Sequence, residues 1–354
     1  MKKRTSILLF LALMTLVFAG CQKKADLLKE PIKDEQFNVG TYVTISIYDK
    51  GKENALQDAF KLITELQALI EVNEEGISNI DEVNANSGLK PTKVDPRIFS
   101  LVKSAKEEAE ATNGAFDPAI GAITHLWHIG FPDAKKPDEK DIQSRLGLVD
   151  YRDIELNDEA KTIYLTKKGI NLDLGGIAKG FIAEQAIEQL KKQGVTTAIL
   201  DLGGHVFTIG ENPKSESGEW KIDIKNPTEK ASTGEKDAES VGTYTGKNSV
   251  FITTSKYERY LLVGDTLYSH LMDPKTGWPY ENDLVAATVV GDNAVKEDAL
   301  SNALYDMGLK DGLDYANKND LMAIFLTKDK TAYVSNAIKE HYEHNSKSSY
   351  KVEK

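Results

Sequence analysis

"NLDLGGIAKGFIAEQAIEQLKKQGVTTAILDLGGHVFTIG" occupies residues 171–210 and contains the tetrapeptide Asp-Leu-Gly-Gly twice, at 173–176 and 201–204. Apolar residues before each copy indicate a buried strand, and the segment between them has helical spacing up to Gly194. If the two strands are neighbours in one sheet, this order favours a right-handed crossover. The repeat is compatible with two ordinary glycine turns or with two walls of one pocket.

The rest of the chain predicts an α+β fold with mixed sheets and packed helices. The early helices do not alternate regularly with strands, which argues against a doubly wound fold. Helices are expected at 53–72, 96–114 and about 294–307, and strands at 37–49, 219–225, 249–254, 258–263, 284–290, 321–327 and 331–335.

The N-terminus predicts export and lipid anchoring. A basic start and an apolar run precede Cys21, the single cysteine of the chain, and residues 1–20 therefore read as a signal peptide. The pattern resembles a bacterial lipoprotein signal with Cys21 as the lipidated residue, and plain secretion with an incidental cysteine is the alternative. We expect a tether at 21–36, one domain at 37–340 and a frayed tail at 341–354. The predicted location is the extracytoplasmic face of the cell membrane, held there by a lipid.

Charge and cysteine content exclude several classes of function. Cleavage removes Lys2, Lys3 and Arg4 from a formal net charge of −11, which leaves −14. An acidic surface argues against nucleic acid as a partner and against electrostatic attachment to anionic lipid. With Cys21 lipidated, the mature domain has no thiol for a disulfide, a thiolate metal site or a nucleophile.

Two local patterns suggest phosphate and metal chemistry. Residues 175–180 form a glycine-rich loop that enters a helix, where backbone N–H groups can approach a phosphate. The loop has neither the Walker A spacing nor that of the dinucleotide fingerprint. Asp298 and Asn302 lie one turn apart on the late helix, so a carboxylate and an amide oxygen can both reach Mg²⁺.

Six blocks in one order resemble the ApbE family of flavin transferases. The blocks are "GAFDP", "LDLGGIAKG", "DLGG", "TTSKYERY", "SHLMDPKTGWP" and "EDALSNAL", and the likeness covers the chain from Gly40 to about Gly308. The resemblance implies a fold related to the T-fold. It also implies Mg²⁺-dependent transfer of FMN from FAD to a Thr or Ser hydroxyl of an extracytoplasmic flavoprotein, with release of AMP.

The resemblance also assigns a metal site and a base. It implies Mg²⁺ ligands at the carbonyl of Ala178, at Asp298 and at Asn302, where the family has threonine. Ser301 is a possible substitute ligand one position away. His270 is the implied base that takes the proton of the acceptor hydroxyl, although a structural histidine is the alternative.

The remaining site residues are implied contacts with the nucleotide. The family's "AFD" segment matches Ala115, Phe116 and Asp117, and its glycine-rich loop matches Gly175, Gly176 and Lys179. Lys179 is also compatible with an exposed first-turn lysine.

Two other functions stay open at this point. The same residues suit an FAD pyrophosphatase, in which water replaces the hydroxyl and the products are free FMN and AMP. A flavin-binding lipoprotein without chemistry is the other alternative.

Overall fold

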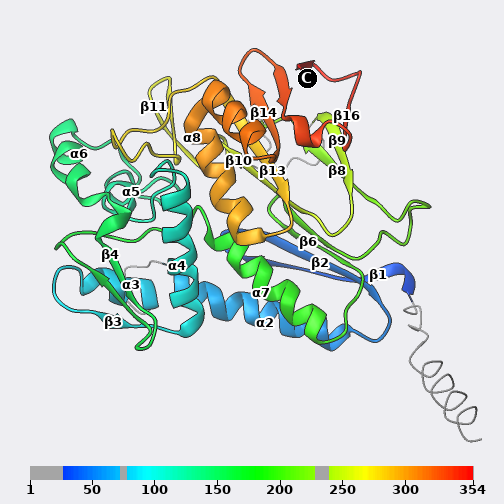
Figure 1. The fold of residues 1–354 in the computed structure, drawn as a ribbon, viewed down its shortest axis with the longest axis horizontal. Helices are drawn as coiled ribbons and strands as arrows, with labels where there is room; N and C mark the ends of the chain where they lie inside the picture. The colour runs from blue at the N-terminus through cyan, green and yellow to red at the C-terminus, as the bar shows by residue number, and fades with distance from the viewer. Residues whose placement is uncertain (1–26, 72–77, 228–238, 354) are drawn as a thin grey trace, which may run out of the picture.

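The computed structural model describes residues 27–71, 78–227 and 239–353, and it has the α+β architecture that the sequence predicts (Figure 1). The predicted signal peptide and Cys21 lie outside these residues. Within the described ranges, no helix is both long enough and apolar enough to span a bilayer.

A large sheet forms the centre of the described structure. Neighbouring strands run antiparallel, except for the last pair, which is parallel. In spatial order the described strands are β1 (Leu27–Asn38), β2 (Thr41–Asp49), β6 (Ala198–Leu202), β7 (His205–Ile209), β10 (Val250–Ser255), β13 (Leu284–Gly291), β14 (Met322–Thr327), β15 (Thr331–Val334) and β17 (Lys351–Glu353).

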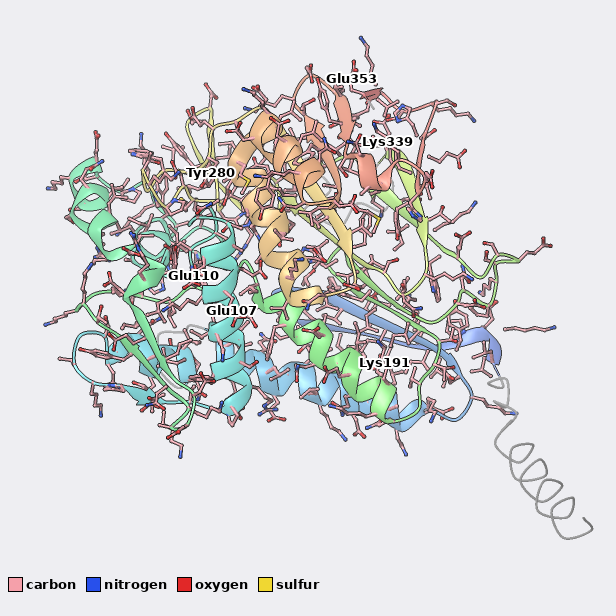
Figure 2. The ribbon with its side chains drawn as sticks, viewed as in Figure 1. Glu107, Glu110, Lys191, Tyr280, Lys339 and Glu353 are labelled. Atoms are coloured by element: carbon pink, nitrogen blue, oxygen red, sulfur yellow. The ribbon has the colours of Figure 1, made fainter. Side chains whose placement is uncertain are left out.

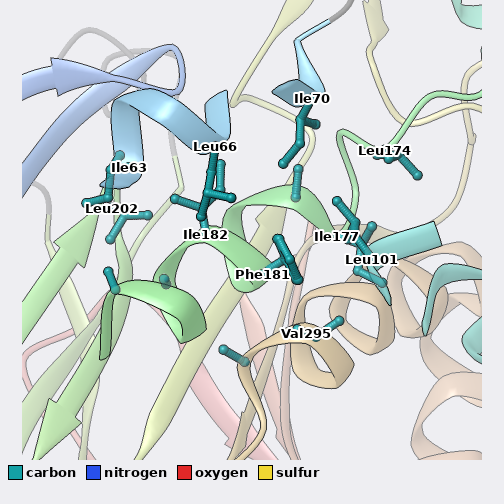
Figure 3. Close-up of a cluster of buried hydrophobic side chains, with 14 of the residues drawn as sticks. Ile63, Leu66, Ile70, Leu101, Leu174, Ile177, Phe181, Ile182, Leu202 and Val295 are labelled. Atoms are coloured by element: carbon teal, nitrogen blue, oxygen red, sulfur yellow. The ribbon is translucent and has the colours of Figure 1, made fainter. Parts of the chain in front are cut away.

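Three helices pack together on one face of this sheet: α2 (Glu53–Ile70), α7 (Ala178–Lys192) and α8 (Ala294–Lys318) (Figure 1). Each turns an apolar stripe inward, and Figure 3 shows Leu66 of α2, Ile182 of α7 and Val295 of α8 in one cluster. Burial of a side chain of this size stabilises the fold by roughly 1.5–3 kcal/mol. Charged residues such as Glu107 and Lys191 lie on the outer surface (Figure 2).

A small sheet covers the opposite face. Residue alternation on β10 separates the two cores, because Ile252 packs with the helices and Phe251 packs with the small sheet. The small sheet contains, in spatial order, β16 (Tyr342–His344), β9 (Ser240–Gly246) and β8 (Trp220–Lys225).

The remaining elements form a lobe beside the helix layer (Figure 1). Its longest helix, α4 (Pro96–Ala111), buries the predicted apolar face and begins with Asp95 as its cap. The other helices of the lobe are α3 (Asn79–Ala85), α5 (Gly121–Trp127) and α6 (Glu139–Arg145), with the 3₁₀ turns η1 (Leu146–Leu148) and η2 (Tyr151–Asp153). Its strands form a sheet of β3 (Thr92–Lys93), β5 (Thr162–Leu165) and β4 (Ile154–Asn157) and a hairpin of β11 (Tyr260–Val263) and β12 (Thr266–Ser269). Outside the lobe, the 3₁₀ turn η4 (Asn336–Ile338) precedes β16.

The predicted crossover is wrong. Residues 170–174 form no strand of the large sheet, and Asn171 makes only an isolated parallel bridge to Ile120. The N–H of Asp173 donates instead to the carbonyl of Pro118 at 2.9 Å. The apolar residues of this segment are buried because the segment packs on the lobe. Hydrophobic periodicity alone does not distinguish such a buried loop from a buried strand.

The predicted tether and tail are also partly wrong. Residues 27–36 belong to β1, which pairs with β2, and residues 342–344 and 351–353 form β16 and β17. β1 lies at the edge of the large sheet, and much of it is exposed or half-buried. An edge strand tolerates polar and charged side chains, so its composition resembles that of a tether.

Candidate active site

Asp298 joins the N-termini of α7 and α8. Its side chain is 1 % exposed, and Oδ2 accepts a hydrogen bond of 2.8 Å from the N–H of Gly180. α7 has no side-chain cap from its own N-cap residue, Ile177, so the carboxylate satisfies one of its free N–H groups from another helix. Burial raises the pKa of Asp298 to about 6, although Lys179 and the Gly180 N–H favour the ionised form.

Gly180 permits this contact because the two helices meet at its Cα. A Cβ there would lie 2.1 Å from the carbonyl oxygen of Ala294 and 2.8 Å from Cβ of Asp298. The backbone of α8 would have to move, and Asp298 would move with it.

We expect Gly180→Ala to lower the free energy of unfolding by about 1–3 kcal/mol, because overpacking against backbone cannot be relieved by a rotamer change. Urea denaturation measures the effect. Gly147→Ala is the matched control, since a Cβ there meets nothing within 4 Å. Equal stability of the two variants would contradict the proposed close packing.

Asn302 lies beside Asp298 as predicted. Its Nδ2 donates to the carbonyls of Gly176 at 3.1 Å and Asp298 at 3.0 Å, while Oδ1 accepts no hydrogen bond from the described residues. The hydroxyl of Ser301, the possible substitute ligand, is buried and bonds the Asp298 carbonyl at 2.9 Å and the Thr254 hydroxyl at 2.7 Å.

The donor set fits a hard cation. Ala178 is the first residue of α7, close to the Gly180–Asp298 contact, and the predicted ligands are all oxygen atoms. No group of three or more His, Cys, Asp or Glu residues suited to a metal occurs in the described ranges. A cation held by one carboxylate, one amide oxygen and a carbonyl would retain positions for water and substrate phosphate, as Mg²⁺ commonly does.

The second Asp-Leu-Gly-Gly is a hairpin turn between β6 and β7. Gly203 and Gly204 have φ angles of 63° and 94°, and Leu202 pairs with His205 across them. Positive φ at both central positions is the geometry of a type I′ turn, which favours glycine.

His205, which follows that turn, is a site residue that the sequence reasoning missed. It is buried, and its Nδ1 lies 3.9 Å from Oδ1 of Asp298 without a hydrogen-bond partner among the described residues. Burial lowers its pKa to about 3, so the ring is neutral. Its position directly after the repeated tetrapeptide was the available signal.

The "AFD" segment packs against the glycine-rich loop. A Cβ on Gly176 would lie 3.2 Å from the Phe116 ring, so the two segments are in close contact. Asp117 is buried, and its two oxygens accept from the N–H groups of Ala119 at 2.8 Å and Tyr151 at 3.0 Å. Its carboxylate therefore holds the segment in place. Ala115 is half-buried against the same core.

Asp117→Asn is expected to destabilise the protein by about 1–3 kcal/mol, because one of the two N–H groups would then face an amide N–H₂. Thermal unfolding followed by circular dichroism checks this. Asp265→Asn, at the exposed turn of the β11–β12 hairpin, is the control. An unchanged melting temperature for Asp117→Asn would show that these hydrogen bonds are dispensable.

His270 follows β12 and is held by its neighbour across the hairpin. Its backbone N–H and its Nδ1 both bond the carbonyl oxygen of Arg259, at 3.1 and 3.0 Å. A carbonyl only accepts, so Nδ1 carries the proton and Nε2 of the neutral ring is a free base. Burial lowers the pKa of His270 to about 4, with Arg259 adding to the effect. Asp273 is a turn acid, since it accepts from Lys275 N and the Thr276 hydroxyl.

Lys179 is paired with Glu258 at 2.5 Å. The two charges lie close enough to shift the pKa of both Asp298 and His270. The structure thus brings Lys179, Asp298 and His270 into one neighbourhood beside Gly175 and Gly176.

Comparisons with known proteins show the family of this chain. A model of the ApbE family matches residues 39–325. The chain belongs to the ApbE family. The predicted membership is therefore confirmed.

Relatives across several organisms support this membership. A protein of Klebsiella pneumoniae named FAD:protein FMN transferase is 31% identical over 84% of this chain and 89% of its own length. One of the same name from Treponema pallidum is 29% identical over 85% of each chain. The crystal structure of the ApbE protein of Thermotoga maritima superposes with a TM-score of 0.79, at 25% identity, over 89% of this chain and all of that one.

Proposed function

We propose that this ApbE protein transfers FMN from FAD to a Thr or Ser hydroxyl of an extracytoplasmic flavoprotein and releases AMP. Two ApbE relatives named for this activity cover more than four fifths of the chain. The observation that carries the proposal is His270, a neutral base held by a backbone carbonyl in the same neighbourhood as Asp298 and the glycine-rich loop.

The proposed reaction is an in-line displacement at phosphorus. The acceptor hydroxyl oxygen forms a bond to the phosphorus of the FMN half, and the bond from that phosphorus to the bridging oxygen breaks. AMP leaves with the bonding electron pair, and the hydroxyl proton passes to Nε2 of His270. The nucleophile belongs to the partner, so the chain needs no nucleophilic residue of its own.

Mg²⁺ is part of the proposal, with Asp298, Asn302 and the Ala178 carbonyl as its protein ligands. When bound there, it would supply positive charge that stabilises the phosphoryl oxygens. The chain itself orients Asp298 through Gly180 and Asn302 through the carbonyls of Gly176 and Asp298.

Membrane anchoring through Cys21 belongs to the same proposal. A lipid on Cys21 would keep the domain on the extracytoplasmic face of the membrane, near exported acceptors. Cys21→Ser should move the protein from the membrane pellet to the soluble fraction. A variant that still sediments with membranes would overturn the anchor.

Mass spectrometry of a candidate acceptor tests the activity. The acceptor is incubated with the protein, FAD and Mg²⁺, and an acceptor whose target hydroxyl is removed serves as control. The expected result is a mass increase of one FMN unit on the intact acceptor only. Formation of free FMN and AMP without an adduct would favour the pyrophosphatase instead.

A further inference from the structure

Arg259 lies between two glycines at the glycine-rich loop. A Cβ on Gly130 would lie 3.0 Å from its Cδ, and one on Gly175 would lie 3.9 Å from its terminal nitrogen NH2. The aliphatic part of the side chain therefore passes Gly130, and the guanidinium approaches the first Asp-Leu-Gly-Gly. Gly130 and Gly175 come from different segments, so Arg259 connects them through space.

Charge pairing distinguishes Arg259 from the nearby lysine. Lys179 is paired with Glu258, and the Lys179 charge lowers the pKa of the Glu258 carboxyl despite the opposing effect of burial. Arg259 is exposed and makes no ion pair within 4.0 Å in the described ranges. Its guanidinium is thus the cation at this loop that remains available to an anionic ligand.

The backbone of Arg259 performs a second task. Its carbonyl oxygen accepts both hydrogen bonds that orient His270. An anion held by the guanidinium would therefore lie close to the base, and the distance between them would be fixed by a single residue.

We infer that the guanidinium of Arg259 binds the pyrophosphate of FAD above Gly175. This inference rests on the proposed function. A guanidinium offers a planar fork of N–H donors that matches two phosphate oxygens, whereas a lysine presents a single point of charge. Because Gly175 has no side chain, the guanidinium lies directly beside the loop backbone, whose N–H groups can approach the same phosphate. Arg259 is thus assigned to substrate binding, and Lys179 to holding Glu258.

Flavin binding without an acceptor tests the inference. Flavin fluorescence titrations give the Kd of FAD and of riboflavin, which lacks phosphate, for the wild type, Arg259→Gln and Arg259→Lys. The Gln variant should bind FAD on the order of tenfold to a hundredfold more weakly, since a charged hydrogen-bond pair is lost. The Lys variant should lie between the two, and riboflavin binding should not change. Lys192→Gln, which removes an exposed charge at the far end of α7, should leave all these values unchanged.

Salt dependence separates charge from structure. FAD affinity of the wild type should fall with ionic strength more steeply than that of Arg259→Gln, because one ionic contact has been removed. Equal weakening of FAD and riboflavin, or an unchanged FAD affinity, would overturn the inference. A wild type that binds FAD but forms no acceptor adduct would overturn only the proposed transfer. A wild type that does not bind FAD would overturn both.

Discussion

Asp298→Asn is expected to lower kcat/KM for FMN transfer by about 10²- to 10³-fold without unfolding the protein. Metal-assisted charge stabilisation is worth several kcal/mol, and each 1.36 kcal/mol is about tenfold in rate. Asparagine has nearly the same shape, and its Oδ1 can still accept from the N–H of Gly180, as Oδ2 of Asp298 does at 2.8 Å. The substitution therefore removes charge while it keeps the link between the helices.

Stability provides an independent measurement on the same variant. The pKa of Asp298 is raised from 3.8 to about 6, so its contribution to stability is present below pH 3.8 and is lost as the pH rises through 6. At pH 7 and without metal, the wild type buries an ionised carboxylate at position 298, whereas Asp298→Asn does not. The variant should therefore melt no lower than the wild type.

The control for Asp298 lies farther along α8, beyond the kink at Gly308, whose φ is 75°. Asp311→Asn removes an exposed carboxylate of α8 and should retain the wild-type rate. Calorimetric titration with Mg²⁺ in the presence of ADP should detect binding to the wild type and to Asp311→Asn, and none to Asp298→Asn. Wild-type activity in Asp298→Asn would remove the metal assignment.

Short-range parts of this site could be predicted from the sequence. The spacing of Asp298 and Asn302 fixes their common helical face, and the structure has Asp298 beside Gly180 and Asn302 beside Gly176. The apolar stripes of α2 and α4 are equally local, and both helices form where the spacing predicts them. Hydrophobic periodicity of this kind depends on the segment alone.

Contacts between distant segments could not be predicted in the same way. Lys179 is paired with Glu258, 79 residues away, and nothing around Lys179 indicates that partner. Gly180 and Asp298 are 118 residues apart, so the reason for a glycine at this position appears only when the two helices meet. The edge strand β1 could not be predicted either, because its polar sequence resembles a tether and only its pairing with β2 identifies it as a strand.

The repeated tetrapeptide combines both cases. The sequence predicts that its first copy ends a strand of the large sheet, but in the structure this copy follows a segment that is hydrogen-bonded to the lobe. The second is a hairpin turn whose next residue, His205, reaches Asp298. Asp298 thus lies between the helix that follows the first copy and the histidine that follows the second.

His270→Gln is expected to slow FMN transfer by about 10²- to 10⁴-fold, the usual contribution of a general base, while FAD still binds. Glutamine can keep a hydrogen bond to the carbonyl of Arg259 but offers no basic nitrogen. Single-turnover transfer to the acceptor measures the rate, and fluorescence titration measures the Kd of FAD.

The pH profile identifies the role of this histidine. Its pKa is lowered to about 4, so the neutral base is already present at pH 5 and above. The contribution of His270 to the profile should therefore be an acidic limb near pH 4 in the wild type, and that limb should be absent in His270→Gln. A limb near 6.5 would mean that the ring is not desolvated during turnover.

A second histidine provides a matched control. The Nδ1 of His341 bonds the carbonyl of Thr245 at 3.1 Å, the same side-chain contact with a backbone carbonyl that His270 makes, but at the small sheet on the opposite face. His341→Gln should transfer FMN at the wild-type rate. If His270→Gln instead loses FAD affinity and keeps its rate on bound FAD, then His270 is a ligand contact and the base must be sought elsewhere. A loss confined to the transfer step would establish Nε2 of His270 as the proton acceptor, because binding and fold would be unchanged.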